Sequence, residues 1–166
     1  MTELKHYEIV VIGAGPGGYA AAFRAADLGK QVLLIDRDNA LGGVCLNRGC
    51  IPSKALLHIS KVMSDADHLS KMGVTYSKPA IDIDQVRAHK NKIVSQLSGG
   101  IAQMAKARKV DTIQGLAAFK SNSELNIETE DGHISISFDK CIIAAGSTSA
   151  TIPGVPNDHP SILTSK

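Results

Sequence analysis

The glycine-rich turn Gly13–Gly18 constrains the fold more than any other stretch, because of what lies on either side of it. An apolar run at 9–12 precedes the turn, an alanine-rich helical stretch follows it to Leu28, and a second apolar run occupies 32–35. Strand, turn, helix and strand in this order predict a parallel βαβ unit built around a G-x-G-x-x-G turn.

Three glycines of the turn and one acid after it have separate physical roles in such a unit. Gly13 permits the tight turn, Gly15 lets the backbone approach a pyrophosphate, and Gly18 lets helix and strand pack closely. The N–H groups at the start of the helix would hold the phosphates. Asp36 ends the second strand where an acid that binds a ribose hydroxyl is expected, so the unit predicts a dinucleotide site. Its charge would repel a 2′-phosphate, which argues against NADP and leaves FAD and NAD open.

The run GGVCLNRGCIPSK at 42–54 contains two cysteines with four residues between them. A bridge between Cys45 and Cys50 closes so short a loop that chain entropy adds only about 2 kcal/mol of stability. Pro52 suits a first helical turn, which places Cys50 beside the positive end of a helix, where a thiolate is stabilised. A redox dithiol is favoured over two buried free cysteines or part of a four-cysteine zinc site. The sequence offers too few ligands for a zinc site, because Cys141 is remote from the pair and no two histidines have the spacing of a zinc finger.

The position of the cysteine pair bears on the choice of dinucleotide. A redox dithiol directly after the second strand would lie near the reacting end of the bound cofactor. Nicotinamide exchanges hydride with soluble substrates, whereas a bound flavin can pass electrons to a nearby disulfide. FAD therefore fits this arrangement better than NAD.

Together with C-I-I-A-A-G-S at 141–147, these motifs resemble the flavin disulfide reductases, most closely their dihydrolipoamide dehydrogenase branch. The four-residue gap differs from the C-x-x-C of the low-molecular-weight thioredoxin reductases. Ile-Pro-Ser-Lys followed by Ala-Leu-Leu-His resembles the lipoamide branch, whereas glutathione and trypanothione reductases usually read Val-Pro-Lys-Lys. Mercuric reductase shares Pro-Ser-Lys and stays an alternative, as does an isolated FAD-binding module without activity.

The resemblance implies a role for each cysteine and a set of FAD contacts. Cys45 would be the thiol that exchanges with substrate, Cys50 would face the isoalloxazine ring, and Lys54 would lie near the flavin N5 and O4 edge. Most relatives have Thr where this chain has Val44 and Ala145. Neither residue has a side-chain hydroxyl, so Ala145 can contact the flavin only through its backbone. The implied cofactor-binding residues are Gly13, Gly15, Pro16, Gly17, Gly18, Asp36, Arg37, Gly42, Gly43, Val44, Cys45, Lys54, Ala117, Ala145 and Gly146.

The chain as a whole predicts an α/β fold, a Rossmann-like parallel sheet of the FAD/NAD(P)-binding type with an inserted helical pair and an antiparallel β-meander. We expect Asp84 to cap the second helix of the pair and Gly99-Gly100 to interrupt it. The elements expected after the cysteine pair are helices over 54–72 and 84–109, a parallel strand at 110–114, a hairpin over 124–138 and a buried parallel strand at 141–145.

Composition sets the outer bounds. With 166 residues, 43% hydrophobic and 20% charged, the chain can bury the core of one domain. A net charge of +2 implies no nucleic-acid partner, and no apolar segment is long enough to suggest a membrane partner. The six scattered histidines suggest no metal site. The cytoplasm is the simplest compartment, with the cysteine pair catalytic.

The resemblance also implies a longer protein. Family members add an NAD domain, a strand that completes the FAD site and a dimerisation domain with a His-Glu dyad, none of which lies in this sequence. We expect 1–150 to be the N-terminal part of an FAD-binding domain and 151–166 a linker toward a missing NAD-binding domain. The full-length homodimer would oxidise dihydrolipoamide on lipoyl domains of 2-oxo acid dehydrogenase complexes, with NAD bound outside this chain. The chain alone is expected to be inactive.

Overall fold

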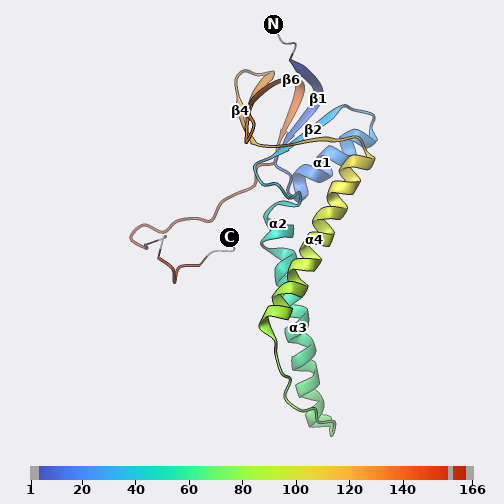
Figure 1. Cartoon of the computed structure of the whole chain (residues 1–166), viewed down its shortest axis with the longest axis vertical. Coiled ribbons are helices and arrows are strands. Elements are labelled where there is room, and N and C mark those ends of the chain that lie inside the picture. The colour runs from blue at the N-terminus through green and yellow to red at the C-terminus, as the bar shows by residue number, and fades with distance from the viewer. Residues whose placement is uncertain (1–3, 157–158, 164–166) are drawn as a thin grey trace.

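The computed structural model describes residues 4–156 and 159–163 and contains one mixed sheet with helices on one side (Figure 1). The expected linker 151–166 is therefore described only in part, and residues 157, 158 and 164–166 lie outside the described residues. In chain order the elements are β1 (Lys5–Ile12), α1 (Pro16–Asp27), β2 (Val32–Asp36), α2 (Gly43–Asn47), α3 (Cys50–His68), the 3-10 helix η1 (Leu69–Met72), α4 (Ile83–Ala107), β3 (Asp111–Gln114), β4 (Leu116–Phe119), β5 (Glu124–Thr129) and β6 (Gly132–Ile143).

The parallel half of the sheet contains the predicted βαβ unit. The strand order is β3-β2-β1-β6-β5-β4, and β1 pairs in parallel with both β2 and β6 while β2 pairs in parallel with β3. Val10 and Val11 on β1 are both fully buried, as expected for a parallel strand covered on two faces. The carboxyl ends of β1, β2 and β6 therefore meet at one edge of the sheet, which is where the candidate site lies.

The antiparallel half is the predicted meander, with one difference. β4 pairs with β5, and β5 pairs with β6 as far as Ser137. From Ile136 onward, β6 instead pairs in parallel with β1, so the expected hairpin arm and the expected strand at 141–145 are one continuous strand. The expectation that this last strand is buried is wrong at its end, because Ile143 is 67% exposed and Cys141 is half-buried. Among the described residues, this part of β6 has a strand neighbour on the β1 side alone.

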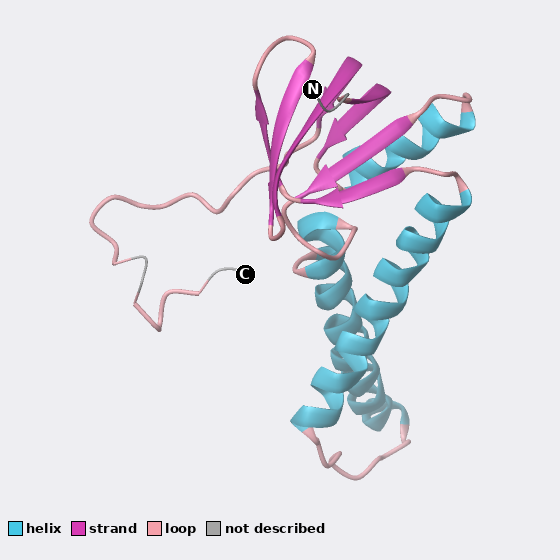
Figure 2. Ribbon diagram, turned by 45° about the horizontal axis from the view of Figure 1, so that its top comes forward, coloured by secondary structure: helices cyan, strands magenta, loops and turns pink. Residues whose placement is uncertain are grey.

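Helices α3 and α4 form the predicted helical pair and project side by side away from the sheet (Figures 1 and 2). Asp82, not Asp84, caps α4: its Oδ1 accepts hydrogen bonds from the N–H groups of Asp84 (3.0 Å) and Gln85 (3.1 Å). The expected interruption at Gly99-Gly100 is also wrong, because α4 continues unbroken to Ala107. Glycine lowers helix propensity by about 1 kcal/mol but removes no backbone hydrogen bond, so packing elsewhere on a long helix overrides it. α3 begins at Cys50, four residues before the expected start.

Two hydrophobic clusters pack on opposite faces of the parallel strands. Phe23 of α1 and Ile101 of α4 belong to the cluster that also contains Val11 and Leu34. The other cluster joins β1 and β2 to the meander, and its members are Tyr7, Val10, Leu33, Ile35, Leu125, Ile127, Ile136 and Phe138. The parallel sheet is therefore the middle layer between helices and meander. None of the helices in the described ranges has the length and apolar character needed to cross a membrane.

Candidate active site

A cleft of about 420 Å³ opens at the carboxyl ends of β1, β2 and β6. This is the position at which open α/β sheets bind dinucleotides. Its volume lies within the ordinary range for ligand-binding clefts. The residues that line it are Gly13, Gly15, Pro16, Gly17, Asp36, Arg37, Asp38, Gly43, Val44, Cys45, Ala144, Ala145, Gly146 and Ser147.

Close backbone contacts explain the glycines of the turn. Gly13 has a φ of +100°, and a Cβ there would collide with the carbonyl of Ala144. A Cβ on Gly18 would overlap the carbonyl oxygen of Gly13, so helix α1 can approach the end of β1 only without a side chain at that position. A Cβ on Gly43 would lie 2.6 Å from the Cα of Gly15, so the start of α2 also touches the turn backbone to backbone. The result is a bare peptide wall along one side of the cleft.

Asp36 connects the cleft to the turn. Its Oδ2 accepts a hydrogen bond of 2.6 Å from the N–H of Ala14, and its Oδ1 accepts one of 2.8 Å from the N–H of Asp38. An ionised carboxylate offers about four acceptor positions, so two remain for a sugar hydroxyl. The sequence indicated the acid but not its two backbone partners, although aspartate commonly accepts from the residue two positions later.

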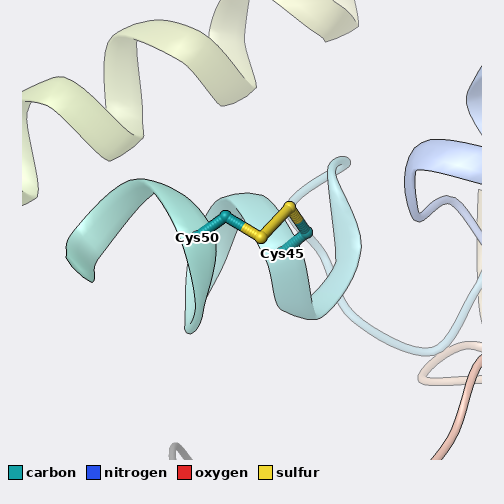
Figure 3. The surroundings of a disulfide bond; sticks show 2 residues. All are labelled: Cys45 and Cys50. Atoms are coloured by element: carbon teal, nitrogen blue, oxygen red, sulfur yellow. A yellow bond between two sulfur atoms is a disulfide. The ribbon is translucent and has the colours of Figure 1, made fainter. Parts of the chain in front are cut away.

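The two cysteines lie on successive helices, Cys45 on the short α2 and Cys50 at the start of the long α3, and form a disulfide (Figure 3). Cys45 is the third residue of α2 and lines the cleft, whereas Cys50 is the first residue of α3 and is exposed. Their Cα atoms are 4.8 Å apart. The prediction that Pro52 lies in a first helical turn, with Cys50 beside the positive end of that helix, is confirmed. The sequence does not predict the short helix α2 around Cys45. A helix of five residues is too short for its apolar spacing to be recognised in the sequence.

Neither the third cysteine, Cys141, nor a zinc site adds to the chemistry of the cysteine pair among the described residues. Burial raises the pKa of the Cys141 thiol, and its half-buried side chain packs against the cluster between the meander and the parallel strands, so it is a neutral residue at the edge of the core. Across residues 4–156 and 159–163 there is no group of three or more His, Cys, Asp or Glu side chains that could hold a metal ion.

Not every residue implied by the resemblance borders the cleft. Gly18 and Gly42 lie behind its wall, Lys54 is an exposed residue of α3, and Cys50 is also outside the lining. Ala117 lines an adjoining hollow of about 180 Å³ that shares Gly13, Asp36, Arg37 and Ala145 with the main cleft.

Three polar side chains that sequence reasoning missed fasten the segment 38–41 beside the cleft. The Arg48 guanidinium pairs with Asp38, with an Nη2 to Oδ2 distance of 2.7 Å. Asn47 Nδ2 donates to the carbonyls of Ala40 (3.2 Å) and Leu41 (3.4 Å), and Ser98 Oγ of α4 donates to Leu41 O at 2.9 Å. No local sequence pattern predicts these contacts, because the two partners of each contact come from separate parts of the fold.

Comparison with known proteins gives consistent results. A family model described as pyridine nucleotide-disulphide oxidoreductase matches residues 7–166. The chain is 51% identical over 156 residues to a dihydrolipoyl dehydrogenase of Haemophilus influenzae, covering 93% of this chain and 33% of that protein. It is 48% identical over 155 residues to a dihydrolipoyl dehydrogenase of Vibrio cholerae, with the same coverage. The chain thus spans about a third of the length of the curated relatives it matches.

A similar solved structure is the Cu(II) complex of the HOCl-induced flavoprotein disulfide reductase RclA from Escherichia coli. It superposes with a TM-score of 0.75 at 30% identity, covering 90% of this chain and 31% of that one. Another structure of the same reductase gives a TM-score of 0.72 at 28% identity. The fold class expected from the sequence is therefore confirmed.

Proposed function

Because the chain belongs to the pyridine nucleotide-disulphide oxidoreductase family, we propose that it forms the FAD-binding part of a dihydrolipoamide dehydrogenase. The observation that carries this proposal is the Cys45–Cys50 disulfide at the edge of a glycine-walled cleft. Residues 1–150 would form the first part of the FAD-binding domain and 151–166 a linker toward an NAD-binding domain. The reaction of the whole protein would be the oxidation of dihydrolipoamide to lipoamide with NAD as electron acceptor.

The cleft fits an FAD molecule on structural grounds. The bare backbone at Gly13, Gly15 and Gly43 leaves room for a pyrophosphate, and the N-terminus of α1 offers it N–H donors. Asp36 retains acceptor positions for the ribose. The residues we assign to FAD binding are those on the cleft wall, those that shape it, Ala117 in the adjoining hollow, and Lys54 on α3.

The cysteine pair can carry out the first half of the reaction. A thiolate of the substrate attacks the Cys45 sulfur, the bond between the two cysteines breaks, and Cys50 leaves as a thiolate. The second substrate thiolate attacks the substrate sulfur bound to Cys45, which releases the cyclic disulfide and the Cys45 thiolate. The substrate loses two electrons and two protons: the cysteine pair gains both electrons as two thiolates, and the protons pass to water.

The position of Cys50 favours this order of events. It occupies the first residue of α3, where the helix dipole and unpaired N–H groups stabilise a thiolate. The bound flavin would supply the two-electron chemistry that returns the dithiol to the disulfide and reduces NAD⁺ to NADH. Lys54, one turn later on the same helix, would place a positive charge near the reduced flavin.

The partners of the whole protein follow from the same proposal. Its substrate group would be carried on lipoyl domains of 2-oxo acid dehydrogenase complexes, and it would act as a homodimer in the cytoplasm. NAD would bind outside this chain, so residues 1–166 alone would not turn over.

The test is dihydrolipoamide-dependent reduction of NAD⁺ by the flavin-loaded full-length protein. We expect Cys45→Ser and Cys50→Ser to abolish turnover, and Cys141→Ser to leave it unchanged, because that half-buried thiol packs against the core and does not line the cleft. Turnover that survives Cys50→Ser would overturn the mechanism. Turnover with Hg²⁺ and a reduced nicotinamide in place of dihydrolipoamide would instead identify a mercuric reductase. A protein that binds FAD but reacts with neither substrate would be a binding module.

A further inference from the structure

Arg48 lies between the two cysteines in the sequence and pairs with a residue of the cleft. Its Nη2 donates to Asp38 Oδ2 at 2.7 Å, and the two side chains are 28% and 30% exposed. Among the ion pairs of the described residues, no other has both side chains so far removed from water. Partial burial and a short, charge-assisted hydrogen bond make this contact stronger than an ordinary surface pair.

Asp38 in turn belongs to a chain of hydrogen bonds that reaches the glycine turn. The N–H of Asp38 donates to Asp36 Oδ1, and Asp36 Oδ2 accepts from the N–H of Ala14. The end of α2, the wall of the cleft and the turn after β1 are therefore linked through Arg48, Asp38 and Asp36. Asn47 adds only neutral hydrogen bonds of 3.2 and 3.4 Å to the same segment.

We propose that Arg48 is a positioning residue that holds the Cys45 end of the dithiol in place when the disulfide is open. This inference rests on the proposed function, because it assumes that the pair cycles between disulfide and dithiol. In the oxidised state the S–S bond itself ties α2 to α3. After reduction that covalent tie is gone, and the Arg48–Asp38 pair remains to hold the end of α2 beside the cleft.

The consequence is a shift in the balance between disulfide and dithiol. With Arg48 paired, the reduced cysteines stay close together, so re-forming the disulfide requires little ordering of the chain. Without the pair, the dithiol gains conformational freedom that the disulfide state does not, and the reduced form becomes more favourable. We expect the ratio of disulfide to dithiol at a fixed redox buffer to fall about fivefold in variants that break the pair.

The test measures this ratio in the flavin-loaded protein, equilibrated with glutathione and glutathione disulfide, quenched in acid, alkylated and read by mass spectrometry. Arg48→Met and Asp38→Asn should both lower the ratio, and the double variant should be no lower than either single variant. Arg48→Lys, which keeps the charge but not the planar fork, should give an intermediate value and serves if Arg48→Met does not fold.

The matched control is the Arg108–Asp27 pair, which joins the end of α4 to α1 with an Nε to Oδ1 distance of 3.0 Å and has side chains that are 33% and 46% exposed. Arg108→Met and Asp27→Asn should leave the ratio unchanged. A simple charge effect on the thiolates would move the ratio in opposite directions for Arg48→Met and Asp38→Asn, because one removes a positive and the other a negative charge. Opposite shifts, or no shift beyond the controls, would overturn the proposal.

The readout needs neither substrate nor NAD, so it separates the two proposals. A shift in the ratio without dihydrolipoamide turnover would contradict the proposed substrate and support the role of Arg48. Normal turnover without a shift would contradict the role of Arg48 alone.

Discussion

The contact between Gly18 and Gly13 gives the sharpest prediction about stability. A Cβ at position 18 would lie 2.8 Å from the carbonyl carbon of Gly13, closer still to its oxygen, and 3.4 Å from the Cβ of Ala144. The Gly13 backbone cannot yield easily, because its N–H donates to Ile35 O at 2.7 Å and its φ is +100°. Gly18→Ala must therefore push helix α1 away from the sheet.

The adjacent Gly17 supplies a matched control, since a Cβ there would meet no atom within 4 Å. Gly17→Ala should be neutral or stabilise the protein by up to about 1 kcal/mol, the gain in helix propensity. Gly18→Ala gains the same propensity but forces overpacking, which destabilises by about 1–3 kcal/mol. Because the overlap is with backbone rather than a flexible side chain, we expect the upper end of that range, or a fall in Tm of roughly 6–12 °C.

The assay is urea unfolding followed by circular dichroism, with the slope of the transition checked for equality between variants. Equal unfolding free energies for Gly17→Ala and Gly18→Ala, whether both variants are stable or both are destabilised, would refute the inferred close approach of α1 to the end of β1.

Four further outcomes are expected. Tyr7→Phe should lower the unfolding free energy by about 1 kcal/mol, measured by urea unfolding, because the Tyr7 hydroxyl donates to Asp111 Oδ2 at 2.7 Å. The Lys5 ammonium and the Tyr7 hydroxyl hold the pKa of Asp111 below its usual value, and the Asp111 hydrogen bond raises the pKa of Lys5. The stability lost in Asp111→Asn should therefore be constant from about pH 5 to 9.5, where both groups are charged. It should shrink below about pH 4, as Asp111 is protonated, and above about pH 10.5, as Lys5 loses its proton. Since both side chains are at least half exposed, that loss should not exceed about 1 kcal/mol, and a larger or pH-independent loss would contradict this account. Ile127→Ala should lower the unfolding free energy by about 2–5 kcal/mol, because the side chain of this β5 residue is fully buried between the meander and the parallel strands. Asp36→Asn should weaken FAD binding about tenfold or more in a fluorescence titration, because the negative charge is lost and one of the two acceptor oxygens becomes an NH2 donor. An unchanged Kd would remove Asp36 from the site.

The helical pair shows where sequence reasoning succeeded in outline and failed in detail. Apolar spacing predicts its existence, but the prediction that Asp84 caps α4 is wrong. The signal for Asp82 was present, because Gln85 stands three residues after it in a capping-box arrangement. Propensity alone predicts an interruption at Gly99 and Gly100, whereas Ile101 and Ala105 on the same helix are buried against the core. Tertiary packing therefore outweighed a local preference.

The meander and the site show a second kind of limit. The pattern of 132–145 indicates a strand at each end but cannot say that β6 changes partners from β5 to β1 near Ser137. The same holds for the exposure of Cys50 and the cleft position of Cys45, since both depend on how α2 and α3 meet the sheet.

The sequence by itself determined the βαβ turn, the acid at the end of β2 and the place of the second cysteine beside the N-terminus of a helix that contains Pro52 in its first turn. Each of these rests on interactions within a few residues or on spacings fixed by one strand and one helix. Only the tertiary structure decided that Arg48 faces Asp38, that Asp36 accepts from Ala14, and that the turn touches Gly43. Those contacts join segments 10 to 30 residues apart, and their geometry exists only once the sheet and helices have packed together.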